Sequence, residues 1–374
     1  AGPDRPFLSL VKGLALAAEG RNREAVEILA PLREAQPDNV PLSLTMARVL
    51  QRDGRRAEAT RILSDLADRL AKEGKAEDER DVRLELAQAW IEAKDWDQAA
   101  AVIAPLLAAK EPAVRTQAVL LQAETLVGEE RQDEALALLE GEGSSPSSPP
   151  SPVIQGRRAE VLFKGGDERE ARRILSGLAE SGDAQSMLAA AQSWQRLDRY
   201  PDSIPVLERL AAKQKDSVAA GFLLGSAYER TGQRPRAVAE FRRVLEIDPD
   251  FHAALNYLGY TYAESGENLE EALSLVGRAV ALEPDNGAYV DSLGWTYYRL
   301  GRHEQARDIL ERAVRLEPAD ATLQEHLGDV YVALGQKERA RQAYRRALEL
   351  ADDNAEQVQR KLERLQDDGP RPRM

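Results

Sequence analysis

The stretch SLGWTYYRLGRHEQARDILERAVRLEP, residues 292–318, decides the fold of this 374-residue chain. Its first half carries a small residue, Gly294, in a helix-forming context, and its second half carries Ala306 followed by Leu310 at helical spacing. Gly301 falls between the two halves, where a helix is expected to stop. The stretch therefore predicts two antiparallel helices that approach closely at Gly294 and Ala306.

This pattern returns about every 34 residues. Ala306 has counterparts at Ala340 and Ala272, each 34 residues away. Carried back along the chain, the anchor positions are Ala25, Ala59, Ala99, Ala135, Ala171, Ser203, Ala237, Ala272, Ala306 and Ala340. A fixed period of this length is the sequence signature of a repeat architecture. We therefore expect about ten helix–turn–helix repeats and an all-α fold, in which the first helix of each repeat is called helix A and the second helix B.

The period and its residue types resemble the tetratricopeptide repeat (TPR) family. The resemblance rests on a glycine such as Gly294 in helix A, an aromatic residue three positions later, the helix B alanine, and a closing proline such as Pro318. It implies a right-handed superhelical solenoid. Arrays of this kind build extended concave surfaces, which favours binding over catalysis. The apolar stripe of Val358, Leu362 and Leu365, opposite a highly charged side, predicts a C-terminal capping helix.

The organisation along the chain follows from this period. Divergent repeats one to four are expected at 6–143, a Ser/Pro-rich loop at 144–152 and repeats five to ten at 153–353. A capping helix is expected at 354–368 and a disordered tail at 369–374. The loop, SSPSSPPSP, cannot continue a helix and is either a simple surface loop or a hinge.

One insertion lengthens the repeat that contains Ala99. The polar stretch AKEGKAEDER, residues 71–80, holds the extra residues and predicts either a longer turn or an extension of the helices.

Composition excludes several classes of function. A net charge of −13 argues against broad nucleic-acid binding, and no apolar run is long enough to span a membrane. The absence of cysteine excludes disulfides and thiolate chemistry. His303-Glu304 begins like a zinc motif, but Arg307 stands where the second histidine is required. We therefore expect no catalytic residues, no metal and no cofactor; an enzyme would also need a further domain, and the repeats leave no room for one.

The candidate binding residues come from helix A of the four most regular repeats. Counting three before, one after and four after the helix A glycine selects side chains expected to line the concave groove. The aromatic ones are candidate anchors for a partner, or they pack between neighbouring repeats, and the acidic ones set the charge preference. The predicted site is Phe222, Asn256, Tyr260, Asp291, Trp295, Tyr298, Glu325 and Asp329.

Some members of the family capture the C-terminal carboxylate of chaperones through a clamp of Lys, Asn and Arg. The corresponding positions here hold Asn256, Asp291 and Glu325, so acids replace the basic residues. The substitution disfavours carboxylate capture and favours a basic or neutral segment.

Residues 254–336 resemble more closely a subgroup of bacterial envelope TPR lipoproteins, of the type that acts as adaptor for a carboxyl-terminal processing protease. This resemblance implies a non-catalytic adaptor in the periplasm or at the outer membrane, whose partners are a protease and its protein or extended-peptide substrates. The chain begins AGPDRPF, and the lipoprotein resemblance implies a signal peptide and a lipid-anchored cysteine, which this sequence does not contain. The alternative is a cytoplasmic TPR co-chaperone or complex-assembly factor.

Overall fold

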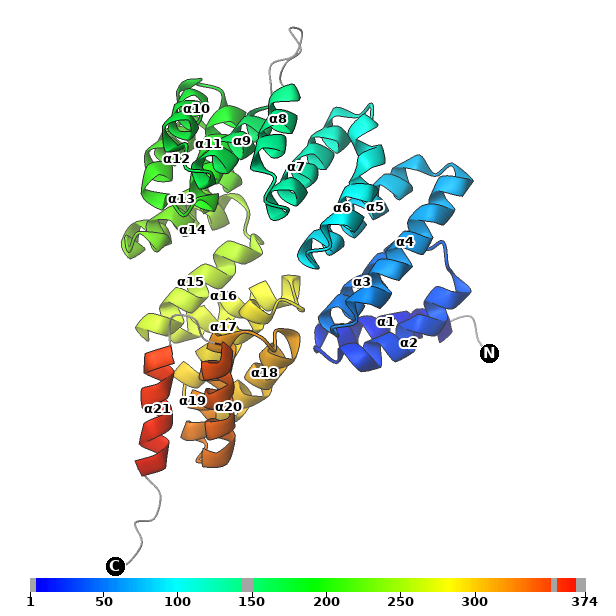
Figure 1. The fold of residues 1–374 in the computed structure, drawn as a ribbon. Helices are drawn as coiled ribbons and strands as arrows, with labels where there is room; N and C mark the ends of the chain where they lie inside the picture. The colour runs from blue at the N-terminus through cyan, green and yellow to red at the C-terminus, as the bar shows by residue number, and fades with distance from the viewer. Residues whose placement is uncertain (1–4, 143–150, 351–354, 368–374) are drawn as a thin grey trace, which may run out of the picture. The chain divides into compact units, whose positions relative to one another are not determined.

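The computed structural model describes residues 5–142, 151–350 and 355–367. These residues form 21 α-helices and one short 3₁₀-helix, and they contain no strand. The predicted all-α repeat architecture is confirmed. Figure 1 shows successive helices lying in antiparallel pairs, such as α17 beside α18, which the packing contacts between the two helices also show.

Each repeat contributes one A helix and one B helix. The A helices are α1 (Arg5–Ala18), α3 (Val40–Arg52), α5 (Ala76–Glu92), α7 (Pro112–Gly128), α9 (Pro152–Lys164), α11 (Ala184–Arg196), α13 (Val218–Arg230), α15 (His252–Ser265), α17 (Gly287–Arg299) and α19 (Ala321–Ala333). The B helices are α2 (Asn22–Ala35), α4 (Arg56–Glu73), α6 (Trp96–Ile103), α8 (Gln132–Gly141), α10 (Glu168–Glu180), α12 (Tyr200–Lys213), α14 (Arg234–Ile247), α16 (Leu269–Leu282), α18 (His303–Leu316) and α20 (Lys337–Leu350). The 3₁₀-helix (Ala104–Ala108) continues α6, and α21 (Ala355–Asp367) follows the last pair.

The small residues of the repeat pattern lie where the helices of a pair meet. All ten anchor positions are completely buried, with 0% exposure, including the one at which Ser203 replaces alanine. A Cβ added to Gly294 would lie 2.6 Å from Cγ of Leu310 on the partner helix, closer than real Cβ contacts come. The close approach predicted from the sequence is therefore present, and it explains why the pattern requires small side chains.

Local hydrogen bonds fix where the helices begin and end. Oδ1 of Asn286 accepts from the backbone N–H of Tyr289 at 3.2 Å and caps α17. The turn after α17 contains Gly301 at φ +74°, a left-handed conformation that glycine adopts without a steric penalty. In four other turns a residue with a side chain has a positive φ, between 51° and 62°: Lys94, Glu130, Asp198 and Asn268.

The insertion at residues 71–80 extends the helices. α4 has 18 residues and α5 has 17, and only a tight turn at Gly74, with φ +72°, separates them. Of the two predicted forms, a longer turn or longer helices, the structure shows the second.

The chain divides into two compact units. Compact unit one comprises residues 1–9 and 26–240, and compact unit two comprises residues 10–25 and 241–374. Most of the predicted Ser/Pro-rich loop and the whole predicted tail lie outside the described residues, so the division at 144–152 stays a prediction. Among the described helices, none combines the length and the apolar character needed to cross a bilayer.

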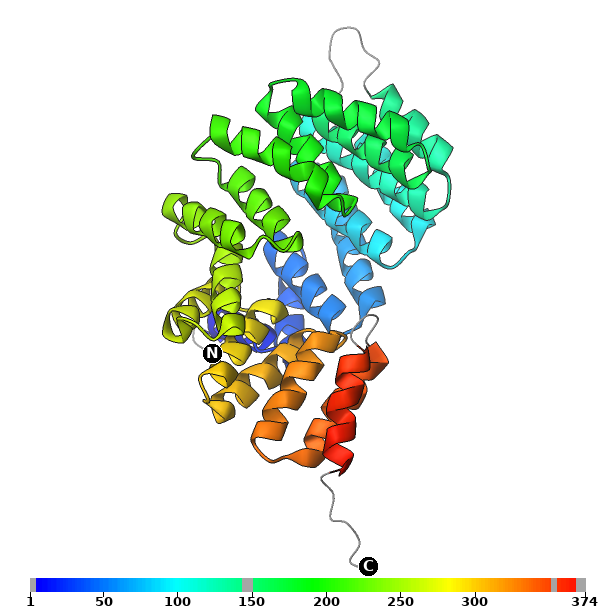
Figure 2. The same ribbon diagram turned by 90° about the vertical axis from the view of Figure 1, so that its left-hand side faces the viewer.

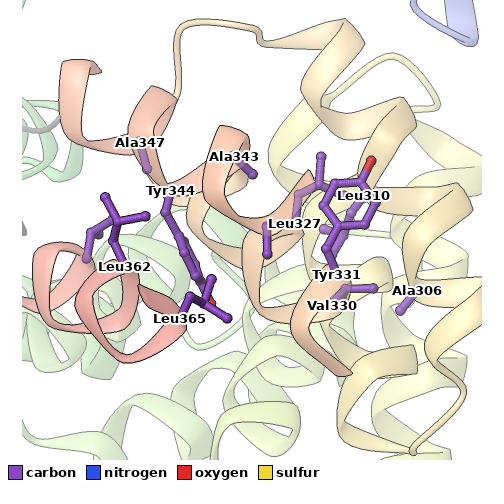
Figure 3. Packing of buried hydrophobic residues seen from close by; sticks show 12 residues of the cluster. Ala306, Leu310, Leu327, Val330, Tyr331, Ala343, Tyr344, Ala347, Leu362 and Leu365 are labelled. Carbon is purple, nitrogen blue, oxygen red and sulfur yellow. The ribbon is translucent and has the colours of Figure 1, made fainter. Parts of the chain in front are cut away.

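The last helix covers the apolar side of the tenth repeat. Val358, Leu362 and Leu365 of α21 are 1%, 6% and 5% exposed, and they belong to one cluster with buried residues of α18, α19 and α20. Figure 2 shows α21 beside α20, and Figure 3 shows Leu362 and Leu365 next to Tyr344. The prediction of a C-terminal capping helix is confirmed, and its apolar stripe is the physical reason that it packs there.

Candidate functional site

All eight candidate residues lie on A helices. Phe222 belongs to compact unit one, and the other seven belong to compact unit two. Asp291 and Glu325 are buried, whereas the remaining six are half-buried. By helix, they are Phe222 on α13, Asn256 and Tyr260 on α15, Asp291, Trp295 and Tyr298 on α17, and Glu325 and Asp329 on α19.

Trp295 connects three successive A helices. Its ring lies nearly parallel to those of Tyr298 and His326, with centroid distances of 4.8 Å and 4.2 Å. Its Nε1–H donates to Oε1 of Glu264 on α15 at 2.5 Å. Trp295 therefore packs between neighbouring repeats, which is one of the two roles predicted for it. Its role as an anchor for a partner stays a prediction.

Asp291 forms a buried pair with a histidine of the next repeat. Nδ1 of His326 lies 2.9 Å and 3.0 Å from the two carboxylate oxygens of Asp291, and the two residues are only 8% and 5% exposed. Burial lowers the pKa of His326, but the charge and hydrogen bond of Asp291 outweigh it, and the pKa lies above its ordinary value. When it is protonated, the histidine is therefore the internal counter-charge of Asp291.

Glu325 and Asp329 have a shared counter-charge on the capping helix. Nζ of Lys361 lies 2.6 Å from Oε1 of Glu325 and 2.6 Å from Oδ2 of Asp329. The hydroxyl of Tyr344 donates to the other oxygen of Asp329 at 2.6 Å. Burial lowers the pKa of Lys361, but the two carboxylates raise it by more, so the lysine stays charged. These acids hold α21 against α19.

The structure changes the interpretation of the three acids. The sequence predicted an acidic surface that sets the charge preference of the groove, but Asp291 and Glu325 are buried and all three acids are paired within the chain. The physical reason is that side chains at these positions of one A helix meet the next A helix, or α21, before they reach solvent. Their part in binding a partner stays a prediction.

Asn256 carries an unsatisfied polar atom inside the helix packing. Its Oδ1 atom is buried and has no hydrogen-bond partner among the described residues. A buried acceptor without a donor costs about 1–3 kcal/mol, and a partner would reach this atom only after the side chains around it move.

Compact unit one contains a hollow that the repeat pattern did not predict. It has a volume of about 490 Å³, within the range of about 300–1,000 Å³ that ligand pockets occupy. Three successive A helices line it, α3, α5 and α7, each contributing a leucine, and polar residues of α5 and α7 complete the lining. The lining residues are Leu44, Asp81, Leu84, Glu85, Gln88, Gln117 and Leu121.

A signal for this hollow was present in the sequence. The counting rule used for the regular repeats, applied from Ala47 and Ala87, selects Leu44, Leu84 and Gln88. The candidates came only from the four most regular repeats, in which helix A carries a glycine, whereas repeats two and three carry Ala47 and Ala87 there. It does not find the α7 residues, because that helix presents Leu121 two positions before its own alanine.

No group of three or more histidine and acidic side chains within the described ranges could hold a metal ion.

Comparisons with known proteins agree with the repeat architecture. The described fold is shared by Tom70 of yeast, with a TM-score of 0.53 at 12% identity over 97% of this chain and 89% of that one. A tetratricopeptide repeat protein from Parabacteroides merdae ATCC 43184 has a TM-score of 0.49 at 15% identity, over 66% of this chain and 97% of that one. MamA from Desulfovibrio magneticus RS-1 has a TM-score of 0.41 at 23% identity, over 45% of this chain and 94% of that one. No curated protein matches the chain.

Two family models match the sequence, and both describe the tetratricopeptide repeat. One matches residues 188–250, 222–289 and 292–355, and the other matches residues 16–77. Together these segments span more than half of the chain, and they carry the Gly and Ala positions that the structure buries between paired helices. The chain belongs to the tetratricopeptide repeat family.

Proposed function

We propose that this chain is a non-catalytic scaffold that binds an extended segment of a partner protein along its A helices. The hollow between α3, α5 and α7 carries the proposal. It combines an apolar floor with a few polar groups, the combination by which protein surfaces bind and orient ligands. Tetratricopeptide repeat arrays are generally protein-interaction scaffolds, which agrees with this role.

A more specific proposal is that the chain is an adaptor in a bacterial envelope, which brings a processing protease together with its substrates. The resemblance of residues 254–336 to envelope lipoproteins of that type supports it. Each compact unit also has its own candidate surface, the hollow in one and the region of Asn256 in the other. An adaptor needs two such surfaces. The alternative, a cytoplasmic co-chaperone, would bind chaperone tails at one of them.

The test is capture of partners from an envelope extract of the source cells by the purified chain, with identification by mass spectrometry. Leu84→Gln places a polar group on the floor of the hollow and should remove the captured partner. Leu282→Gln is the matched control, because Leu282 is 44% exposed on α16 and does not line the hollow. Circular dichroism would show that both variants keep their helical content. Equal capture by the two variants would refute the role of the hollow.

A further inference from the structure

The floor of the hollow suits one large apolar side chain. Leu121 is 8% exposed, and Leu44 and Leu84 are half-buried, so their side chains present apolar atoms to the open space. Removing this apolar surface from water favours binding. A leucine, isoleucine, methionine or phenylalanine of a ligand would cover these three side chains.

The charged part of the lining is entirely acidic. Asp81 and Glu85 are one helical turn apart on α5, so they lie on the same edge of the hollow, and no lysine or arginine is among the seven lining residues. Arg48 lies outside the lining and pairs with Glu85 at 2.8 Å, in an exposed position. Exposed pairs of this kind stabilise little, so a cation of a ligand can compete with Arg48.

The remaining polar groups suit a peptide backbone. Gln88 and Gln117 come from neighbouring A helices, and each amide both donates and accepts hydrogen bonds. An extended peptide presents N–H and C=O groups that such amides can pair with. A terminal carboxylate would instead lie beside Asp81 and Glu85, where like charges repel it.

We infer that the hollow selects an internal, extended peptide segment with a large apolar side chain next to a lysine or arginine, and that it rejects a free C-terminal carboxylate. The inference rests on the proposed function, since it names the chemistry of the segment that the scaffold holds. It is carried by the leucine floor, the two acids of α5 and the two glutamine amides.

The first experiment selects peptides from a random library displayed within a loop, with both ends covalently joined, on the immobilised chain. The charge variant is Asp81→Asn/Glu85→Gln. The control Glu77→Gln/Asp78→Asn removes the same charge from the same helix, outside the lining. The unchanged chain and the control should enrich apolar residues flanked by Lys or Arg at least about fivefold, the ratio that 1 kcal/mol produces. The charge variant should keep the apolar preference and lose the basic one.

Each outcome decides something different. If the charge variant keeps the basic preference, the inference is wrong and the proposed function stands. If selection on the unchanged chain gives peptides whose binding survives Leu84→Gln, the hollow is not the binding surface and both proposals fail.

A second measurement tests rejection of the carboxylate. Fluorescence anisotropy would compare a selected peptide blocked at both ends with the same peptide ending in a free carboxylate directly after its apolar residue. The free acid should bind at least about threefold more weakly, because its charge lies beside two carboxylates. Equal or tighter binding of the free acid would overturn this part of the inference.

Discussion

Nζ of Lys361 lies 2.6 Å from a carboxylate oxygen of Asp329, and this pair joins the capping helix to the tenth repeat. The same ammonium also reaches Glu325 at 2.6 Å, so one cation of α21 neutralises two acids of α19. Apolar packing of Val358, Leu362 and Leu365 brings α21 to this end of the array, and the ion pairs fix where along α19 it lies.

Removing the charge of Lys361 should loosen the capping helix. Lys361→Met keeps much of the apolar stem but leaves Glu325 and Asp329 without their cation. Breaking a buried pair costs about 3–5 kcal/mol, and since the Lys361 side chain is 24% exposed, we expect about 2–3 kcal/mol. Hydrogen exchange of the α21 amides should be roughly 30- to 160-fold faster.

The control for Lys361→Met is a substitution of the neighbouring Arg360. Arg360 pairs with Glu356 on the exposed side of α21, where both side chains are more than half exposed. Arg360→Met should leave the exchange rates of α21 unchanged, since exposed pairs stabilise little. Similar acceleration in the two variants would show that Lys361 does not hold the helix through its charge.

Two glycines of compact unit two should respond to alanine in opposite directions. Gly294→Ala puts a Cβ 2.6 Å from Cγ of Leu310, and such overpacking costs about 1–3 kcal/mol. Gly277→Ala, on α16, meets nothing within 4 Å and should stabilise by about 0.5–1 kcal/mol, because alanine favours the helix. Thermal unfolding of both variants tests the pair. A gain in stability in Gly294→Ala would contradict the close crossing of α17 and α18.

The sequence alone was sufficient to predict which positions pack within a repeat. Ala306 and Gly294 must be small because two helix backbones approach there, and this requirement recurs with the period of the chain. Contacts between repeats carry no such constraint. Asp291 and His326 are 35 residues apart and Lys361 is 32 residues from Asp329, so nothing in the local pattern shows that these charges meet. The three acids were therefore interpreted as an open surface.

The hollow was missed for a related reason. Its floor depends on which side chains three different A helices direct into one space, and α7 presents Leu121 from a position that the repeat pattern does not mark. A rule based on one repeat can select Leu44 and Leu84, but not the residue that completes the lining.

The pair of His326 and Asp291 should make stability depend on pH. The pKa of the buried histidine is raised in the folded state above its ordinary value of about 6.5. Its contribution is therefore fully present below about pH 6.5 and is lost as the pH rises through the folded pKa. The melting temperature of the unchanged chain should fall more between about pH 6 and pH 8.5 than that of His326→Gln.

A second variant separates this effect from loss of packing. Asp291→Asn keeps the shape of the side chain but removes the charge that most favours the histidine cation. It should show the same reduced dependence on pH as His326→Gln. If both variants keep the dependence of the unchanged chain, other groups cause it.

The turn between α5 and α6 contains a strained residue. Lys94 has φ +57°, although most of the equivalent turns use glycine at φ between 71° and 95°. A residue with a side chain in this conformation costs about 1–2 kcal/mol of stability. Replacing it with glycine removes that cost, but the greater conformational freedom of glycine in the unfolded chain cancels part of the gain. Lys94→Gly should therefore stabilise by about 0.5 kcal/mol. Ala93→Gly, at φ −77°, should instead destabilise, and thermal unfolding of the two distinguishes them.

Substitutions of Trp295 and Tyr298 can distinguish a role in packing from a role in binding a partner. Trp295→Ala removes a ring that contacts Tyr298 and His326 and also leaves Glu264 without its N–H donor. Large-to-small changes of a buried aromatic cost about 3–5 kcal/mol, and for this half-buried ring we expect about 2–3 kcal/mol. Trp295→Phe keeps a smaller ring and loses the hydrogen bond and part of the ring packing, which should cost about 1–2 kcal/mol.

The affinity of each variant for the partner then shows whether the residue also anchors the partner. If Trp295→Phe binds the partner as the unchanged chain does, the indole acts only in packing. Tyr298→Ala should lower affinity more than stability if its half-buried ring is an anchor, because an anchor typically contributes about 2 kcal/mol or more to binding. Binding is measured by titration of the identified partner and stability by thermal unfolding of the same samples. A variant that loses stability while keeping full affinity removes that residue from the predicted site.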